Sequence, residues 1–387
     1  MTKSSLRILV LVTDAFGGHG GIAQYNRDFI TSLTQSDRVS DVIVLPRATP
    51  TLVTSLPAGV QYLPAVNGRI AYSLAAIRAA KAYRPIDVVF CGHPFMAPLA
   101  VVIAKPLRAS LWVQVHGIDA WEELSFFYRK SIEMADLVTS VSRYTRQRLL
   151  GWVGIEPTRV KILPNTVDSR FQPGPKPNHL LERYAVRGGK VLLTVSRLAR
   201  VEQYKGNDQV IRALPLVLLE HPQTIYVIVG DGDDRPRLEA LAAEVGVMEN
   251  VRFAGHVTHE ELPDHFRVAD AFVMPSTAEG FGIVFLEAMA SGVHVIGGNR
   301  DGSLDPLADG VLGRVVDPYN REELTSVICT ALRDAPAKVD RADRFNFQAF
   351  ADHLHELVGS SFISASNRAP RMEAVQKTVY DQNTWNR

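Results

Sequence analysis

Two basic residues in the second half of the chain, Arg197 and Lys205, could together hold a diphosphate. Arg197 follows the apolar run 191–195, and Lys205 comes after the polar loop 200–204. A guanidinium forms forked hydrogen bonds to phosphate and an ammonium acts as a movable point charge, each charge-assisted bond contributing about 1.5 to 3 kcal/mol. Either residue alone would be typical of a solvated surface, so the prediction rests on their convergence at one strand end.

A segment with two acids and two glycines could complete that site. It reads Glu279-Gly280-Phe281-Gly282-Ile283-Val284-Phe285-Leu286-Glu287. The glycines precede a predicted helix at about 283–291, whose free amides and positive dipole end favour phosphate oxygens. Glu287 lies more than one turn inside this helix, within reach of ribose hydroxyls, and Glu279 precedes it, where a sugar could bind. Two carboxylates beside a diphosphate are unfavourable unless hydroxyls donate hydrogen bonds to them, which predicts a polyhydroxyl ligand.

A glycine-rich loop near the start of the chain is a second candidate for ligand contact. Gly17, Gly18, Gly20 and Gly21 follow the first apolar run and precede a predicted helix. Glycines let the backbone approach a ligand closely, and a helix start favours an anion. The loop fits the loose dinucleotide fingerprint, but the second apolar run ends in Pro46-Arg47 and lacks the acid that NAD requires. NADP binding, and a turn needed only for tight packing, are the alternatives.

Short apolar runs rich in Val and Ile must position these groups. They alternate with amphipathic stretches, which is typical of βα units in a parallel sheet buried on both faces. The runs are residues 8–12, 42–45, 88–91, 111–115 and 137–141, then 191–195, 225–229, 251–253, 271–274 and 294–296. We therefore expect an α/β fold with two doubly wound, Rossmann-like domains.

Three prolines and one glycine within residues 171–178 mark the domain boundary, because they cannot continue a helix or a central strand. We expect an N-terminal domain at 1–170, a C-terminal domain at 171–342, an amphipathic helix at 343–362 and a loose tail at 363–387. Ligands of open parallel sheets bind beyond the carboxyl ends of the strands, which predicts a cleft between the domains. His116, directly after the run 111–115, would face this cleft and hydrogen-bond a sugar, although a lone histidine is as often structural.

Composition excludes several classes of protein. The formal charge of +1 over 387 residues gives no field that would attract nucleic acid, and the hydrophobic share of 46% is ample for compact cores. Cys91 and Cys329 lie in apolar surroundings, and we expect them to be buried free thiols in a reducing, cytoplasmic compartment. The apolar stretch 88–104 is interrupted by glycine and prolines, so no membrane span is expected.

Two charged clusters are assigned to structural roles. Asp231, Asp233 and Asp234 could attract a divalent cation, but they follow a strand as a turn into a helix, where aspartate is a common turn and cap residue. No metal is therefore expected. Basic residues of the first domain could meet anionic lipid, but neighbouring acids favour a solvated face. These are Arg129, Lys130, Arg143, Arg146 and Arg148.

Over about its first 360 residues, the chain resembles family 4 of the retaining GT-B glycosyltransferases. The joint match comprises Glu279 and Glu287 at their spacing, together with Arg197, Lys205-Gly206, Val229-Gly230-Asp231-Gly232, Phe253-Ala254-Gly255 and Leu163-Pro164-Asn165. The resemblance implies a GT-B fold whose two domains face an interdomain cleft. It also implies that Arg197 and Lys205 neutralise a donor diphosphate, that Glu287 binds ribose, and that Glu279 faces the donor sugar.

The same resemblance implies further contacts. His116 matches a histidine near the C6 hydroxyl of the sugar, and the loop 17–21 would approach the donor phosphate and the acceptor. The segment from Phe253 to 257 would border the base, and the helix after Asp343 would cross back to the first domain. One departure is the loop between Arg197 and Lys205, which is longer than the commonest form in the family.

The implied activity is transfer of a hexose, preferably mannose, from a GDP- or UDP-sugar to a glycan, lipid-linked or small-molecule acceptor, with no metal or other cofactor. Departure of the diphosphate develops negative charge, which preorganised cations and a helix start would stabilise. In the resembling family the usual proposal is front-face attack with retention, in which the donor phosphate takes the acceptor proton.

Rival functions and the cellular setting follow from the same features. A sugar-nucleotide epimerase or phosphorylase of the same architecture, an NADP-dependent oxidoreductase, and a non-catalytic sensor are the alternatives. Polysaccharide or lipid-linked glycan biosynthesis is the expected setting. We expect a cytoplasmic protein, and a peripheral contact with the inner face of a membrane is left open.

Overall fold

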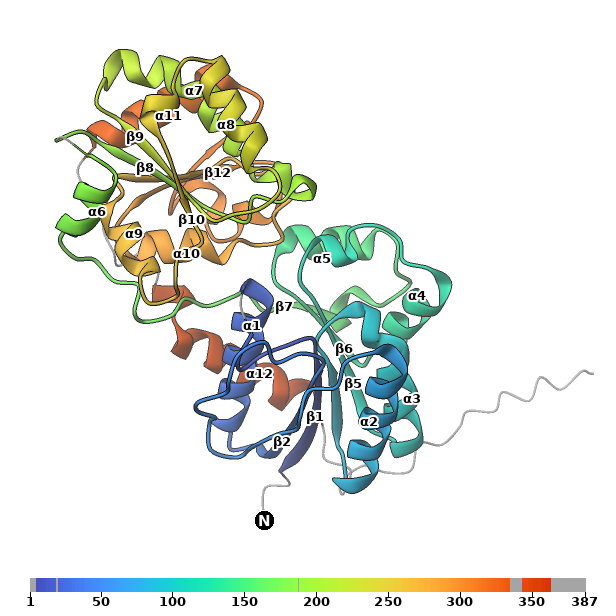
Figure 1. The fold of residues 1–387 in the computed structure, drawn as a ribbon. Helices are drawn as coiled ribbons and strands as arrows, with labels where there is room; N and C mark the ends of the chain where they lie inside the picture. The colour runs from blue at the N-terminus through green and yellow to red at the C-terminus, as the bar shows by residue number, and fades with distance from the viewer. Residues whose placement is uncertain (1–4, 19, 187, 335–342, 363–387) are drawn as a thin grey trace, which may run out of the picture.

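The chain folds into two α/β domains, each built on a parallel sheet with helices on both faces (Figure 1). The computed structural model describes residues 5–18, 20–186, 188–334 and 343–362. Within these residues the first sheet has the strand order β3-β2-β1-β4-β5-β6-β7, and the second has the order β10-β9-β8-β11-β12-β13. The strands pair in parallel throughout both sheets. The predicted pair of doubly wound domains is confirmed.

The elements of the first domain follow one another in βα order. They are β1 (Leu6–Val12), α1 (Gly21–Thr34), β2 (Val39–Pro46), β3 (Val60–Tyr62), α2 (Arg69–Ala82), β4 (Val88–Cys91), η1 (Pro94–Met96), α3 (Ala97–Leu107), β5 (Ser110–Val115), η2 (Ile118–Ala120), α4 (Phe126–Glu133), β6 (Leu137–Ser140), α5 (Arg143–Leu150), η3 (Pro157–Arg159) and β7 (Val160–Ile162).

The second half repeats this alternation. Its elements are α6 (Asn178–Arg183), β8 (Val191–Val195), η4 (Arg200–Lys205), α7 (Asn207–Glu220), β9 (Ile225–Val229), α8 (Arg235–Glu244), η5 (Met248–Asn250), β10 (Val251–Gly255), α9 (Leu262–Val268), β11 (Ala271–Met274), α10 (Ile283–Ala290), β12 (His294–Gly298), η6 (Gly302–Leu304), η7 (Ala308–Gly310), β13 (Arg314–Val316), α11 (Arg321–Arg333), η9 (Asp343–Phe345) and α12 (Phe347–Ser361).

Strand order creates a natural binding position in each sheet. β1 lies between β2 and β4, and β8 lies between β9 and β11, so the connections from the central strands leave in opposite directions. Loops diverge at such a point and leave a crevice beyond the carboxyl ends of the strands. The fold therefore directs the loops after β1 and β8 toward a ligand.

The ten apolar runs all form strands, but three strands were missed. These are β3, β7 and β13, each of three residues and each at the outer edge of its sheet. Edge strands carry polar residues such as Gln61, Lys161 and Arg314 among few apolar ones. A strand of three residues is too short to show a clear period, which is why these three were missed.

A buried polar network lies within the core of the first domain, close to the end of β5. The Tyr25 hydroxyl donates to Gln114 Oε1 at 2.7 Å, and Trp112 Nε1 donates to Thr139 Oγ1 at 2.7 Å. Thr139 Oγ1 in turn donates to Gln114 Oε1 at 2.6 Å. Because satisfied buried networks rigidify a core, the strand end that carries His116 is held in one position.

The final described helix packs on the first domain although it follows the second in sequence. His355 Nε2 of α12 lies 2.8 Å from the carbonyl oxygen of Ser32 on α1, and the Phe350 ring lies edge-on to Tyr25 with centroids 6.0 Å apart. The buried residues of the helix include Leu354 and Leu357, as its amphipathic pattern predicted. The expected tail 363–387 lies outside the described residues. Among the described helices, none is both long and apolar enough to span a bilayer.

Candidate active site

A cavity of about 660 Å³ lies between the domains and is lined by loops at the carboxyl ends of both sheets. Most of the predicted site residues contribute to its wall. They are Gly20, Gly21, His116, Arg197, Lys205, Glu279, Gly280, Gly282, Ile283 and Glu287. Sequence segments far apart in the chain therefore meet at one polar cavity.

Three predicted contact residues do not line this cavity. A Cβ on Gly18 would lie 2.6 Å from the carboxylate of Asp14, so this glycine is required by close packing within its own loop. Phe253 lies on the edge strand β10, with the Arg235 guanidinium 5.4 Å from its ring centroid. Phe281 is buried and packs against Phe345, with ring centroids 5.9 Å apart. The residues on either side of Phe281 face the cavity, while its side chain points into the core.

Two helices direct their N-termini at the cavity from opposite domains. Gly21 is the first residue of α1 and Ile283 is the first residue of α10. A Cβ on Gly21 would lie 3.6 Å from Ile283 Cδ1, so the two helix starts meet across the cleft. Because each start carries free amides and a partial positive charge, the cavity favours an anion even before side chains are considered.

Glycines at the junction allow the backbones of the two domains to touch. A Cβ on Gly280 would lie 2.1 Å from the carbonyl oxygen of His116, and one on Gly117 would lie 2.8 Å from Gly280 Cα. A β-carbon cannot fit at either position without moving a backbone. The loop after β5 and the loop before α10 are therefore in direct backbone contact at the wall of the cavity.

Lys205 and Glu279 form a largely buried ion pair on the cavity wall. The Lys205 ammonium donates a hydrogen bond to the Glu279 carboxylate, and each side chain is only 15% exposed. Burial acts to lower the pKa of Lys205, but the charge of Glu279 and its hydrogen bond outweigh that effect, so the pKa is raised. Lys205 ends η4, and Gly206, with φ of 78°, then turns the chain into α7. The ammonium is therefore fixed and charged.

Arg197 is held more loosely than Lys205. Its guanidinium pairs with the carboxylate of Glu202, another cavity residue, but the Arg197 side chain is 80% exposed. Glu202 lies in the loop 200–204, whose extra length distinguishes this chain. No sequence signal marked Glu202 as a site residue, because the pairing arises only when η4 folds back toward the end of β8.

A buried acid that sequence reasoning missed holds the Glu279 loop. Asp301, three residues after the end of β12, accepts hydrogen bonds from Ser276 Oγ at 2.8 Å, from the Glu279 amide at 2.6 Å and from the Ser303 amide at 2.9 Å. Burial raises the pKa of Asp301, against these hydrogen bonds. The sequence signal that could have revealed Asp301 is its position shortly after β12, the strand beside β11. Asp301 does not line the cavity but positions Glu279.

The Glu287 carboxylate faces the cavity from the first turns of α10. Burial raises the pKa of Glu287 to about 8, with Arg170 opposing this rise and Asp168 adding to it. Its side chain has no hydrogen-bond or ion-pair partner among the residues that the structure describes. A carboxyl group with this pKa is largely protonated near neutral pH, so it can both donate to and accept from hydroxyl groups.

His116 is a neutral histidine with one free nitrogen. Its Nε2 lies 3.0 Å from the carbonyl oxygen of Gly92, and its ring lies edge-on to Tyr25 at 5.1 Å. Burial lowers the pKa of His116, against the attraction of Asp119. Because a carbonyl can only accept, Nε2 carries the proton and Nδ1 is left as an acceptor. That acceptor could take a hydrogen bond from a sugar hydroxyl.

The charged clusters that we assigned to structural roles are paired within the protein. Asp234 pairs with Arg237, and Asp233 accepts a hydrogen bond from the Arg200 amide at 2.9 Å. The basic residues of the first domain are mostly matched by acids: Arg143 with Asp305 and Asp309, Arg148 with Glu122, Arg129 with Glu123, and Lys130 with Glu133. Both cysteines are buried free thiols.

Comparisons with known proteins identify the family of the chain. The model described as Glycosyltransferase Family 4 matches residues 19–171, and the model described as Glycosyl transferases group 1 matches residues 185–349. The chain is 38% identical to the GDP-mannose-dependent alpha-(1-6)-phosphatidylinositol monomannoside mannosyltransferase of Mycolicibacterium smegmatis, over 64% of this chain and 68% of that protein. The protein of the same description in Mycobacterium tuberculosis is 31% identical over 85% of this chain and 89% of its own length.

Solved structures show the same fold. Anabaena HepE, determined in complex with UDP and glucose, superposes with a TM-score of 0.74 at 22% identity, over 92% of this chain and 100% of that chain. Identity at this level shows the architecture alone. The family itself is shown by the relatives above 30% identity, and the chain therefore belongs to the family 4 glycosyltransferases of the GT-B fold.

Proposed function

We propose that this glycosyltransferase moves mannose from GDP-mannose to a lipid-linked acceptor, with retention of configuration and without a metal ion. The observation that carries the proposal is the shared cavity in which Lys205, Glu279, Glu287 and two helix N-termini converge. The choice of GDP-mannose and of a lipid-linked acceptor rests on the relatives from Mycolicibacterium smegmatis and Mycobacterium tuberculosis, which are named as mannosyltransferases of this kind.

Donor binding would exchange the partners of Lys205. In the free protein its ammonium is paired with the Glu279 carboxylate. A donor diphosphate carries more negative charge than one carboxylate and would replace Glu279 beside the lysine, helped by the start of α10. Glu279 would then be released to accept hydrogen bonds from sugar hydroxyls. The same acid thus keeps the lysine charged before binding and contacts the sugar afterwards.

Charge stabilisation would supply the main catalytic effect. As the bond between the sugar C1 and the phosphate oxygen breaks, negative charge grows on the diphosphate, where Lys205, Arg197 and the amides of α10 already lie. The acceptor oxygen forms its bond to C1 on the same face and passes its proton to a departing phosphate oxygen. The buried Lys205, with a smaller contribution from Arg197, would take the role that a divalent ion has in other transferases.

Glu287 and His116 would hold hydroxyl groups at the two ends of the donor. The Glu287 carboxyl, with its raised pKa, suits a pair of ribose hydroxyls because it can donate to one and accept from the other. The free Nδ1 of His116 would accept from a hydroxyl of the transferred sugar. Both side chains lack competing partners at those atoms in the described residues, so they are available to a ligand.

A peripheral membrane contact would bring the enzyme to a lipid-linked acceptor. Exposed aromatic residues gather on the first domain: Phe126 and Phe127 begin α4 at 59% and 75% exposure, and Phe95 of η1 packs against Tyr128 with ring centroids 5.5 Å apart. Aromatic side chains favour the interface between lipid and water. Because the neighbouring Arg129 and Lys130 are paired with acids, the contact would rely on the rings more than on charge.

A panel of nucleotide sugars tests the donor and the reaction. Purified protein is incubated with GDP-mannose, UDP-glucose and other donors, with and without a phosphatidylinositol mannoside in vesicles, and release of nucleoside diphosphate is measured. We expect GDP release that depends on GDP-mannose and on the acceptor, and that persists when a metal chelator is added. NMR of the product should show the α-linkage.

The same assay separates the alternatives. An epimerase would isomerise the donor alone, and exclusive use of a UDP-sugar would refute the assignment to GDP-mannose. Family membership removes the NADP-dependent alternative.

A further inference from the structure

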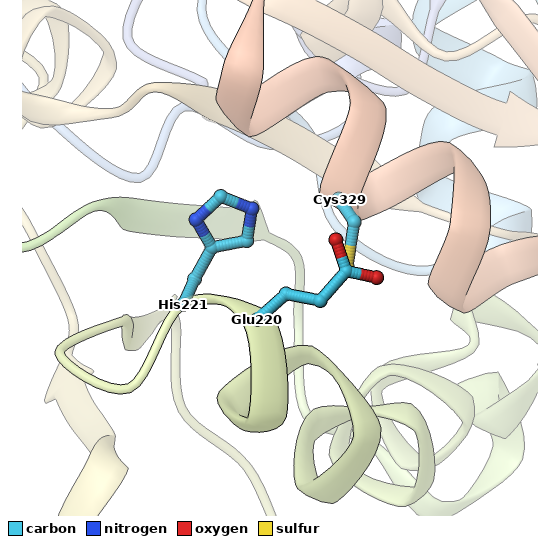
Figure 2. A group of neighbouring side chains, drawn as sticks. All are labelled: Glu220, His221 and Cys329. Carbon is cyan, nitrogen blue, oxygen red and sulfur yellow. The ribbon is translucent and has the colours of Figure 1, made fainter.

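Three potential metal ligands meet at the end of the second domain that lies away from the cleft. Glu220 is the last residue of α7, His221 follows it, and Cys329 lies on α11, which packs along α7. Figure 2 shows their side chains converging on one space between the two helices. The carboxylate, imidazole and thiol ligand atoms all lie within 4.8 Å of one another. Within the described residues this is the one group of its kind.

Unsatisfied polar atoms mark this position as incomplete. His221 Nε2 is inaccessible to solvent and has no hydrogen-bond partner within the described part of the chain. Thr224 Oγ1, three residues further along the same turn, is buried and unpartnered in the same way. Because buried polar atoms are nearly always paired, an imidazole nitrogen left without a partner beside a thiol and a carboxylate points to a missing ligand.

The competing interactions at this position are weak. Glu220 forms an ion pair with Arg333 at 3.7 Å, and the two side chains are 52% and 60% exposed. Exposed pairs of this kind contribute about 0 to 1 kcal/mol, so the carboxylate can leave Arg333 at little cost. Cys329 is buried on the face of α11 that meets α7. The Cys329 thiol donates a hydrogen bond to the Glu220 carboxylate, and a metal ion would take the place of the thiol proton between these two groups. No described contact accounts for the His221 nitrogen beside them.

We propose that Glu220, His221 and Cys329 form a zinc-class metal site with a water molecule as the fourth ligand. Sulphur, imidazole nitrogen and carboxylate oxygen form the ligand set that Zn²⁺ prefers, whereas Mg²⁺ and Ca²⁺ require oxygen. Zinc binds sulphur at about 2.3 Å and nitrogen at about 2.0 Å, so tetrahedral ligands lie about 3.5 Å apart. The flexible Glu220 side chain can close the remaining gap. Binding would release the thiol proton to solvent.

The site is structural, because it is remote from the donor cavity. α7 has 14 residues and begins directly after Lys205-Gly206, so its far end lies about 21 Å from the lysine at 1.5 Å per residue. A metal there would tie the C-terminal end of α7 to α11 and stabilise the helix that carries the lysine loop at its other end. It would raise thermal stability without entering the transfer reaction.

The test uses the full chain with any purification tag removed and bound metal stripped by a chelator. Zn²⁺ is titrated in competition with a chromophoric chelator, and Co²⁺ is titrated while the ultraviolet and visible spectrum is recorded. We expect saturation at one equivalent, a sulphur-to-cobalt charge-transfer band, and a rise in Tm with Zn²⁺. Binding that does not saturate at one equivalent, or a cobalt complex without the sulphur band, would overturn the proposal.

Variants separate the site from adventitious binding. Cys329→Ser, His221→Gln and the surface change Glu220→Gln should each weaken Zn²⁺ binding at least about tenfold, since even loss of a residue that only supports a ligand costs 10- to 100-fold. Cys91→Ser is the matched control and should bind as the wild type does, because that thiol lies in the first domain. If Cys329→Ser fails to fold, the Glu220→Gln and His221→Gln affinities decide, and unchanged values would refute the site.

Discussion

The backbone amide of Glu279 donates a 2.6 Å hydrogen bond to the buried carboxylate of Asp301, 22 residues further along the chain. The same carboxylate accepts from Ser276 and from the Ser303 amide, so it ties the start and the middle of the turn between β11 and α10 to the segment after β12. Asp301 does not line the cavity, yet it holds the turn that carries Glu279. It is a positioning residue of the proposed site.

Replacement of Asp301 with Asn should lower kcat more than it weakens donor binding. Both carboxylate oxygens accept, Oδ2 from Ser276 and the Glu279 amide and Oδ1 from the Ser303 amide. In Asn one of these oxygens becomes an NH2 group that cannot accept, so at least one buried donor is left unpaired at about 1 to 3 kcal/mol. The turn would then shift, and misplacement by about 1 Å can cost 10²-fold in rate. Steady-state kinetics check this, with Asp317→Asn as a control acid outside the cleft. If Asp301→Asn lowers the stability of the protein but leaves kcat per folded molecule unchanged, Asp301 acts in folding alone.

Lys205→Ala should reduce turnover more than Arg197→Ala. Lys205 is largely buried in the cavity and fixed by Glu279, whereas Arg197 is mostly exposed and paired with Glu202. Removing one preorganised group that stabilises developing charge costs about 10² to 10³ in kcat, and an exposed, mobile cation contributes less. Measurement of kcat and KM for both variants gives the comparison. Near-normal activity in both would refute the assignment of the diphosphate site.

The buried strands and the residues Arg197, Lys205 and Glu279 were predictable from the sequence, whereas Glu202, which pairs with Arg197, and Asp301, which holds the Glu279 loop, were not. Central strands such as β4 and β9 are buried on both faces, so their Val and Ile runs carry a strong signal. Arg197, Lys205 and the Gly280 segment lie in the connections that follow β8 and β11, and a doubly wound sheet brings those connections together. The prediction of these residues required only the topology.

Asp301 and Glu202 were missed because their partners are defined only in three dimensions. Asp301 bonds to a backbone amide, which any residue possesses, so no partner residue type could reveal it. Phe281 shows the opposite failure: its neighbours face the cavity, but the turn through Gly282 at φ 84° directs the ring into the core against Phe345. The sequence pattern does not predict which way a side chain points within an irregular turn.

Stability of the free enzyme should depend on pH through Glu287. Its pKa is about 8 in the folded protein against an ordinary value of 4.5, so the folded state holds a proton that the unfolded state has lost. Stability from this group is therefore fully present below about pH 4.5 and is lost as pH rises through about 8. Glu287→Gln should flatten that decline, as measured by urea unfolding between about pH 6 and pH 9.

The matched control for Glu287 is Glu244→Gln, an exposed acid at the end of α8. It should keep the pH dependence of the wild type. Glu287→Ala should weaken binding of free GDP in calorimetry, because it removes the side chain that would contact the ribose hydroxyls. Glu287→Gln should bind GDP near neutral pH about as the wild type does, because an amide, like a protonated carboxyl, can donate one hydrogen bond and accept another. A variant with the wild-type pH slope would show that Glu287 is ionised in the folded state.

Phe126→Ser together with Phe127→Ser should reduce binding to phospholipid vesicles. Both rings are largely exposed at the start of α4, so their removal costs the fold little. Burying a large apolar side chain contributes about 1.5 to 3 kcal/mol, so losing two rings should weaken vesicle affinity more than tenfold in a sedimentation assay. Activity on a vesicle-embedded acceptor should fall, whereas activity on a water-soluble acceptor analogue should not. An equal fall on both acceptors would contradict a membrane role.

Gly280→Ala should separate the two domains at their point of contact. The added Cβ would lie 2.1 Å from the carbonyl oxygen of His116 and 2.9 Å from Gly117 Cα, so the loops of opposite domains must move apart. Because His116 and Glu279 lie on those two loops, the two groups that we propose to face the transferred sugar would be displaced from each other. A displacement of about 1 Å costs about 10²-fold in kcat/KM.

Gly359→Ala is the control for this variant and should leave both Tm and kcat/KM near wild type. Gly359 lies within α12, and an added Cβ would meet only the end of the Arg38 side chain. One buried apolar cluster runs through both domains, but each domain also has a buried cluster of its own. Gly280→Ala should therefore lose more activity than stability, and an active variant would show that the domain junction tolerates opening during catalysis.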